Sequence, residues 1–242
     1  MYSYFTKRGI PKETLDKFKI FDEKGWFGFQ YFNENNELEN IKYRTVEKGF
    51  KQTKGAKQIL YNYNNIVKKK TIVFVEGEMD VLSCDVVGYD STTLPNGAPI
   101  EAKFNEHDAR FRALQNCPLE ATKIIIFTDT DTAGRALHKE LLHRFGKDIS
   151  WFVRLPEDCK DANDVLVKYG KKKLKEILDN AEPYPVEGLY TANDYYGQLH
   201  DLYHANYIKF FERARSEFLS DNKISQSELK KNDQAFVIKS VN

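Results

Sequence analysis

The sequence predicts an α/β protein built on a parallel sheet with flanking helices. Two continuous apolar runs, TIVFVEG at 71–77 and KIIIFTD at 123–129, have the composition of buried strands. A helix-like segment follows each run, and strand–helix alternation of this kind is typical of parallel sheets. A smaller antiparallel α+β pattern precedes this part of the chain, and a helical pattern follows it.

The first region, 1–67, has the pattern of a small antiparallel α+β subdomain. Gly9-Ile10-Pro11 is followed by a short amphipathic helix that carries Leu15 and Phe18 on one side. Strand-like runs then occupy 26–32 and 38–46, and the polar stretch between them is typical of a hairpin loop.

The second region, 71–181, alternates between strands and helices. Strands are predicted at 71–77, 91–94, 123–129 and 150–155, and helices at 78–88, 101–116, 133–145 and 162–180. The PNGAP segment at 95–99 has the composition of a turn. We expect this region to form the principal domain.

The third region, 183–242, is predicted to be a linker and a helical tail. Pro183 and Pro185 indicate the linker. Apolar residues then recur at helical spacing, which predicts one amphipathic helix from about 192 to 220. Ser225 and Glu228 have the spacing of a capping box, so a last short helix is expected.

Composition excludes some classes of protein. The formal net charge is +1, which excludes a strongly basic nucleic-acid coat protein but allows a local basic face. The three cysteines are far apart, so neither a zinc ribbon nor a disulfide framework is expected. We see no signal peptide and no membrane span, so the sequence predicts a cytoplasmic protein.

Three acidic residues follow the two long apolar strands. Glu76 ends the first, Asp129 ends the second, and Asp131 lies two residues further on. Sites in open α/β sheets form outside the carboxyl ends of the strands, so these carboxylates should meet at one edge. Hard oxygen ligands of this kind favour Mg²⁺, with Mn²⁺ as the alternative ion. The structural alternative is that Asp129 and Asp131 merely cap the following helix.

A basic stretch lies in the first region. Lys42 and Arg44 alternate in a strand, so both side chains lie on one face. Residues 42–57 hold six basic residues, Lys51 among them, and one acid, which favours a partner that carries phosphates. The alternative is a solvated hairpin edge protected by lysines. Asn96 lies in an Asn-Gly pair, which by itself is typical of an ordinary turn.

These motifs carry a resemblance to a known family. EGEMD at 76–80 and DTDTAG at 129–134 resemble the two signature motifs of the Toprim domain. Further segments resemble the primase half of phage helicase-primases and Twinkle-like proteins: the opening at 4–20, LPNGA at 94–98, KDAND at 160–164 and EGLYTANDYY at 187–196. The resemblance spans about 1–203 and implies a Toprim-type parallel sheet.

The resemblance also implies roles for single residues. Glu76, Asp129 and Asp131 would be catalytic and hold Mg²⁺, with Asp80 and Asp161 as secondary acids of the same site. Two metals would activate a 3′-hydroxyl and stabilise the leaving pyrophosphate. The residues expected to bind nucleotide or template are Lys42, Arg44, Lys51 and Asn96.

The implied activity is synthesis of RNA primers on single-stranded DNA from ribonucleoside triphosphates. A zinc ribbon and a G-x-x-x-x-G-K-[ST] ATPase motif, which helicase-primases carry, are not found in the sequence. We therefore expect a free-standing primase core, or one that works with a separate replicative helicase docked on the C-terminal helix. The alternatives are a non-catalytic module that binds DNA and a helicase, and a Toprim nuclease.

Overall fold

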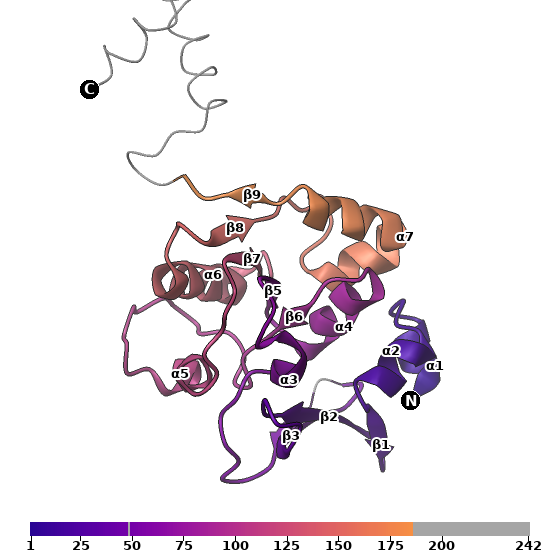
Figure 1. Ribbon diagram of the computed structural model, residues 1–242. Coiled ribbons are helices and arrows are strands. Elements are labelled where there is room, and N and C mark those ends of the chain that lie inside the picture. Colours follow the sequence, from indigo (N-terminus) through magenta and orange to yellow (C-terminus); the bar gives the residue numbers. More distant parts are fainter. Residues whose placement is uncertain (48, 186–242) are drawn as a thin grey trace, which may run out of the picture. The chain divides into compact units, whose positions relative to one another are not determined.

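The computed structural model describes residues 1–47 and 49–185, which form two sheets and their helices (Figure 1). The first sheet is antiparallel, in the order β1-β2-β3-β4. Its strands are β1 (Phe21–Glu23), β2 (Trp26–Phe32), β3 (Leu38–Arg44) and β4 (Phe50–Gln52). Three short helices accompany it: α1 (Tyr2–Thr6), α2 (Lys12–Lys17) and α3 (Tyr63–Ile66). β2 and β3 confirm the predicted hairpin, whereas β1 and β4 are too short for a recognisable pattern.

The second sheet has the order β6-β5-β7-β8-β9. Its strands are β5 (Thr71–Val75), β6 (Ser91–Thr92), β7 (Lys123–Phe127), β8 (Ser150–Phe152) and β9 (Glu182–Pro183). The pairs among β6, β5, β7 and β8 are parallel, as predicted, but β9 pairs with β8 in the antiparallel direction. Pro183, expected to begin a linker, lies instead in this edge strand, where a proline is tolerated.

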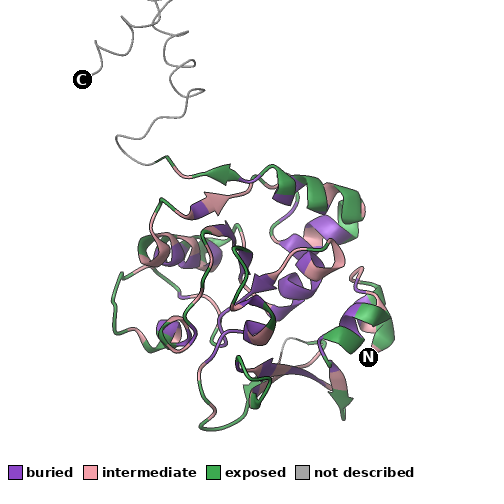
Figure 2. Ribbon diagram, viewed as in Figure 1, coloured by how far each residue is buried: buried purple, intermediate pink, exposed green. Residues whose placement is uncertain are grey.

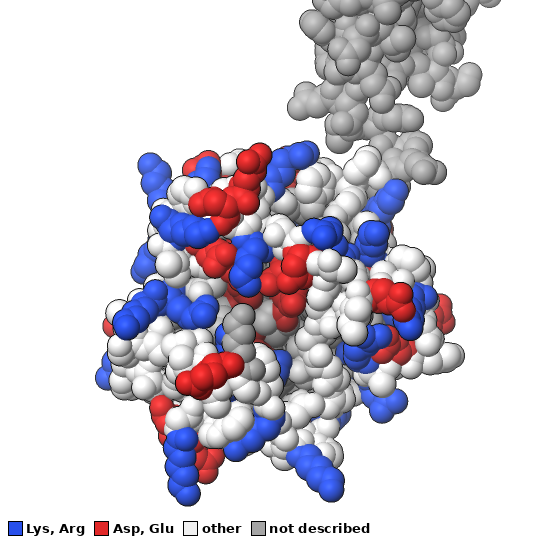
Figure 3. All heavy atoms as spheres, turned by 180° about the vertical axis from the view of Figure 1, so that it is seen from behind, with Lys and Arg blue, Asp and Glu red and all other residues white. Residues whose placement is uncertain are grey.

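Long helices cover both faces of the second sheet. α4 (Glu78–Val86) and α7 (Ala162–Asp179) lie on one side of it and α6 (Thr132–Phe145) on the other (Figure 1). The central strands are buried and the outer faces of the helices are exposed (Figure 2). On the face seen in Figure 3, acidic side chains gather near the middle, with Lys and Arg side chains around them. α7 is interrupted at Gly170, whose φ of 79° is not helical.

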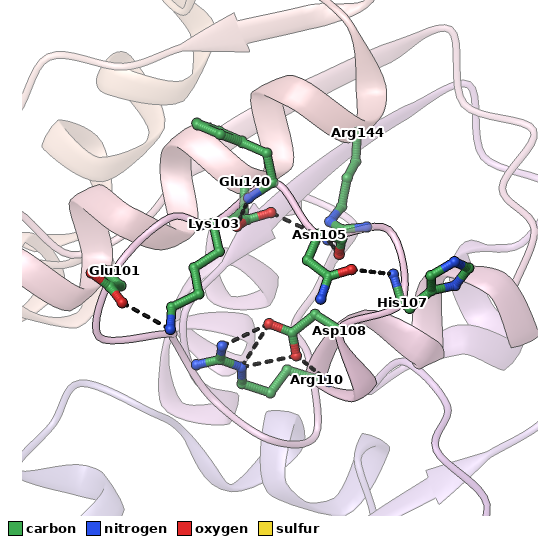
Figure 4. Close-up of polar contacts among 9 residues, drawn as sticks. Glu101, Lys103, Asn105, His107, Asp108, Arg110, Glu140 and Arg144 are labelled. Carbon is green, nitrogen blue, oxygen red and sulfur yellow. Dashed lines mark hydrogen bonds and ion pairs between the residues drawn. The ribbon is translucent and has the colours of Figure 1, made fainter.

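The helix predicted at 101–116 is wrong over its first half. Only a 3₁₀ turn, η1 (Ala109–Phe111), and the short α5 (Arg112–Asn116) form there. The carboxylate of Glu140 in α6 accepts the backbone N–H groups of Lys103 and Phe104, at 2.7 and 2.8 Å (Figure 4). These donors are therefore satisfied by a distant side chain, which holds the segment as a loop on α6.

The predicted fold class is confirmed, with the antiparallel subdomain before the parallel strands. Residues Met1–Pro185 form one compact unit, and the predicted boundary between 67 and 71 stays a prediction. The helical tail predicted beyond Pro185 lies outside the described residues. Within the described part of the chain, none of the helices has the length and apolar character needed to cross a membrane.

Candidate active site

The strand-end carboxylates lie at one edge of the second sheet. Val75 of β5 pairs with Phe127 of β7, so both strands end at the same level. Glu76 and Asp129 follow these ends. Both line a cavity of about 340 Å³, together with two acids from helix starts, Asp80 and Asp161. Four of the five predicted acidic residues therefore line one cavity, and Asp131 is not among its lining residues.

The acids of this cavity destabilise one another's charged forms. Burial and the nearby charges of Asp129 and Asp131 raise the pKa of Glu76 to about 7. Burial and Asp161 raise the pKa of Asp129 to about 6, although Lys160 opposes this. The pKa of Asp80 is also raised, by burial and then by Asp161 and Asp129. The cluster therefore carries more negative charge than the surrounding protein neutralises.

Lys160 is the cation nearest to these acids, and the sequence analysis did not select it. Its Nζ lies 3.1 Å from Asp161 Oδ2 and 3.7 Å from Asp129 Oδ2. The side chain is half exposed, so it bridges the two carboxylates from the solvent side. Lys160 is the first residue of the KDAND motif, and this position is the sequence signal by which it could have been identified.

The capping alternative describes part of the arrangement. Asp131 Oδ1 accepts the N–H of Gly134 at 2.9 Å at the start of α6, and Asp161 Oδ1 accepts the N–H of Asp164 at 2.7 Å at the start of α7. Asp129 caps neither helix in this way. Among residues 1–47 and 49–185, no three acidic, His or Cys side chains converge in a ready-made metal cage.

The donor set nevertheless fits a hard divalent cation. Glu76 Oε2 is buried and accepts no hydrogen bond from the described residues. A buried acceptor without a partner is costly, and a cation would satisfy it. Carboxylate oxygens beside such an atom are the ligands that Mg²⁺ prefers, with water completing its shell. The residues present therefore suit Mg²⁺ better than a softer metal.

Gly134 fixes how closely α6 approaches the end of β7. A Cβ atom at this position would lie 2.1 Å from the backbone oxygen of Asp129, closer than any real contact. Only glycine permits this approach, so the spacing between Asp129 and Gly134 in the DTDTAG motif has a steric reason. The same approach places Asp131 at the N-cap of α6.

Basic side chains line the same cavity as the acids. Lys42 and Arg44, both predicted, are joined there by Arg8, which the sequence analysis missed. Arg44 Nε is buried without a hydrogen-bond acceptor among the described residues. An oxyanion, such as a phosphate, would supply that acceptor.

Lys42 differs from its expected role as a free cation. Its Nζ lies 2.8 Å from Oε1 of Glu78, a buried residue at the start of α4. The hydroxyl of Tyr31 donates to the same oxygen at 2.5 Å. Burial alone would raise the pKa of Glu78, but the Lys42 ion pair and hydrogen bond hold it below its usual value. Lys42 therefore joins the antiparallel sheet to α4.

The last two predicted residues, Lys51 and Asn96, line a second cavity of about 380 Å³. Lys42, Phe50 and Gly97 border both cavities, so the second adjoins the first. The Lys51 ammonium, however, lies over Tyr43, 4.8 Å from the ring centre. Because Lys42 and Tyr43 alternate along β3, Lys51 lies on the face opposite Lys42. Asn96 accepts from Gln52 and donates to Gln58.

Asn163 of the KDAND motif is a further residue that the sequence analysis missed. Its backbone N–H donates to Asp80 Oδ1 at 3.1 Å. Its side-chain amide donates to the backbone oxygen of Arg8 and to Ser83 Oγ, both at 2.9 Å, and accepts from the Arg8 guanidinium at 3.0 Å. Asn163 therefore holds an acid and a base of the cavity in fixed relation.

These strand-end acids lie within residues 73–166, which match the family model described as Toprim-like. The chain is 33% identical over 218 residues to the Twinkle homolog protein, chloroplastic/mitochondrial, of Arabidopsis thaliana, covering 83% of this chain and 31% of that protein. It is 35% identical over 202 residues to the Primase homolog protein of Arabidopsis thaliana, covering 76% and 60%.

A solved structure agrees with these relatives. The primase fragment of the bacteriophage T7 primase-helicase protein superposes with a TM-score of 0.60 at 27% identity, covering 74% of each chain. The expected resemblance to the primase half of phage helicase-primases and Twinkle-like proteins is thus confirmed, as is the Toprim-type fold. The chain spans 31% and 60% of the two Arabidopsis proteins.

Proposed function

We propose that this protein is a metal-dependent DNA primase, which synthesises RNA primers on single-stranded DNA from ribonucleoside triphosphates. One observation carries the proposal: acidic and basic side chains line a single cavity of a Toprim-like domain. Nucleotidyl transfer needs both, because a cation held by acids and a separate cationic wall together bind a triphosphate. The primase names of the relatives support the same activity.

In this proposal Glu76, Asp129 and Asp131 hold Mg²⁺ or Mn²⁺, and Asp80 and Asp161 support them. When bound, the metal would activate the attacking 3′-hydroxyl and stabilise the leaving pyrophosphate. Lys160 offsets the charge of Asp129 and Asp161 before the cation arrives. The unpartnered oxygen of Glu76 supports its assignment as a ligand.

The basic wall would bind the phosphates of the nucleotide. Arg44 is the strongest candidate, because its buried Nε lacks an acceptor among the described residues. Arg8 lines the same wall and is positioned by Asn163. Lys42 shares its charge with Glu78 and would contribute less than a free lysine. We keep Lys51 and Asn96 as weaker candidates for template contact.

The proposed partners are single-stranded DNA and a separate replicative helicase. The helicase contact rests on the amphipathic pattern at about 192–220, which lies outside the described residues, and on relatives named for combined helicase and primase proteins. We propose a cytoplasmic location, as for a replication protein that acts on DNA in a bacterial or phage-infected cell.

The test is a priming assay with the full chain, single-stranded DNA, labelled ribonucleotides and Mg²⁺. We expect short RNA products from the wild-type protein and a loss of at least about a hundredfold in Asp129→Asn. Asp16→Asn is the matched control, because Asp16 is an exposed acid of α2 outside the cavity.

Two outcomes would contradict the proposal. Tight DNA binding that needs no Mg²⁺, with no RNA product, would indicate a non-catalytic binding module. Shortened DNA would indicate a nuclease. Equal product from wild type and Asp129→Asn would remove Asp129 from the catalytic residues.

A further inference from the structure

The chemical character of the lining residues changes from the first cavity to the adjoining second one. The first cavity is lined by the acids and by Lys42 and Arg44. Phe50 borders both cavities, and beyond it the second cavity is lined by Gln52 and Asn96. A nucleotide has the same order, since a metal-bound phosphate tail leads to an aromatic base.

Phe50 has an unusual place for an apolar side chain. It is 56% exposed and lies on β4, directly opposite Arg44 in the sheet register. Its ring centre is 5.8 Å from Lys42 Nζ and 5.6 Å from Arg44 Cζ. Among the described residues that line either cavity, Phe50 is the only aromatic one. An exposed aromatic ring beside two cations matches the sites at which proteins stack nucleobases.

We propose that the ring of Phe50 stacks on a nucleobase whose phosphates lie against Arg44 and Lys42. This inference rests on the proposed function, because it deepens how the same site binds its substrate. The buried Arg44 Nε without an acceptor supports it independently of the ring, since it indicates a missing oxyanion next to Phe50. A single exposed Phe would otherwise need no explanation.

Stacking of this kind tolerates all bases, because each base has a π-face. The amides of Gln52 and Asn96 bond to each other at 3.2 Å, and Asn96 also donates to Gln58 at 2.6 Å. These neighbours are thus largely satisfied within the protein, and the subsite has little means of reading base edges. We expect purines to bind more tightly than pyrimidines by several-fold at most, in line with their larger rings.

Binding measurements test the proposal without relying on primer synthesis. Phe50→Trp should bind ATP with a quench of tryptophan fluorescence that the wild-type protein does not show. Phe50→Leu keeps an apolar side chain but loses the ring, and should weaken ATP binding about tenfold, the effect expected for one lost base stack. Inorganic triphosphate, which has no base, should bind wild type and Phe50→Leu equally. Phe104→Leu is the matched control, because Phe104 is 47% exposed and lines neither cavity.

The source of the base is decided by a second titration with a fluorescent DNA oligonucleotide. Weaker ATP binding with unchanged oligonucleotide binding assigns the subsite to the incoming nucleotide, and the reverse result assigns it to the template. If Phe50→Leu binds both as wild type does, the proposal is overturned. If the Phe50 variants prime normally and their binding is unchanged, the proposed function stands and the base-stacking subsite is contradicted. If Phe50→Trp shows the fluorescence quench but the protein makes no primer, the base-stacking subsite stands and the proposed function is contradicted.

Discussion

Glu76 combines three properties that rarely coincide in a structural acid. It is partly buried, it lies near the charges of Asp129 and Asp131, and its Oε2 has no donor among the described residues. A folded protein retains such a group at a cost in stability, which is typical of sites where function sets the requirement. This cost in stability can be measured.

We predict that Glu76→Gln stabilises the metal-free protein at alkaline pH. The pKa of Glu76 is raised from 4.5 to about 7, so the folded state holds this proton more tightly than the unfolded state does. The charged form therefore costs nothing below about pH 4.5, and its penalty grows as the pH rises to about 7. After discounting for solvent screening we expect on the order of 1 kcal/mol, or about 2–4 °C in Tm.

Thermal unfolding in EDTA at pH 8 and at pH 4.5 measures this effect. Glu76→Gln should melt higher than wild type at pH 8 and at the same temperature at pH 4.5, with Asp16→Asn as a neutral control. Adding Mg²⁺ should raise the Tm of the wild type more than that of Glu76→Gln. A wild type that is equally stable or more stable at pH 8 in EDTA would show that Glu76 is not strained.

At the scale of the element, the loop before α5 shows how one buried side chain overrides a local pattern. The stretch 101–116 has a helical appearance in the sequence, yet Glu140 draws its backbone donors to α6. Glu140 is 1% exposed and also pairs with Arg144 at 3.2 Å. The two loop donors, Lys103 and Phe104, lie 37 and 36 residues away from Glu140, so their contact with it cannot be identified from the sequence.

We predict that Glu140→Ala releases this loop. Two backbone N–H groups would lose their hydrogen bonds to this carboxylate, which costs about 1–3 kcal/mol, and Arg144 would lose its ion-pair partner. Hydrogen exchange at the amides of Lys103 and Phe104 should become much faster than in wild type. Glu176→Ala, which removes an exposed acid of α7 paired with Lys173, should leave those amides protected. Unchanged protection in Glu140→Ala would contradict this account of the loop.

The strands illustrate what the sequence predicts well. β5 and β7 come from unbroken apolar runs, and a strand buried on both faces leaves that pattern wherever it occurs. The acids at their ends follow from the topology, so Glu76 and Asp129 could be selected from the sequence. Lys160, Arg8 and Asn163 could not, because their roles depend on partners that only the folded chain brings near. The ion pair of Lys42 with Glu78 was missed for the same reason.

At the scale of the whole molecule, Glu78 forms the polar contact that connects the two sheets. It lies in α4, and its partners Lys42 and Tyr31 lie in the antiparallel sheet. The Glu78 side chain is 4% exposed and that of Lys42 14%, so removal of either leaves a buried charge. The contacts of Glu78 with Lys42 and Tyr31 therefore hold the basic wall in a fixed position relative to the acids.

We predict strong coupling between these two residues. Glu78→Leu should cost about 3–5 kcal/mol, because it leaves Lys42 buried without a counter-charge. The double variant Lys42→Met/Glu78→Leu should be clearly more stable than the sum of the two single changes implies. Urea unfolding of the four proteins in this cycle measures the coupling energy. Additive effects would show that the pair does not join the sheets.

The most direct measurement of the central claim, that the strand-end acids form a divalent metal site, is a Mn²⁺ titration followed by electron paramagnetic resonance. We predict that wild type and Asp16→Asn bind the ion alike, and that Asp129→Asn binds at least about tenfold more weakly. Wild-type affinity should rise between pH 6 and pH 8, because Asp129 and Glu76, with pKa values of about 6 and 7, must lose their protons to bind. Equal binding by wild type and Asp129→Asn would contradict the account.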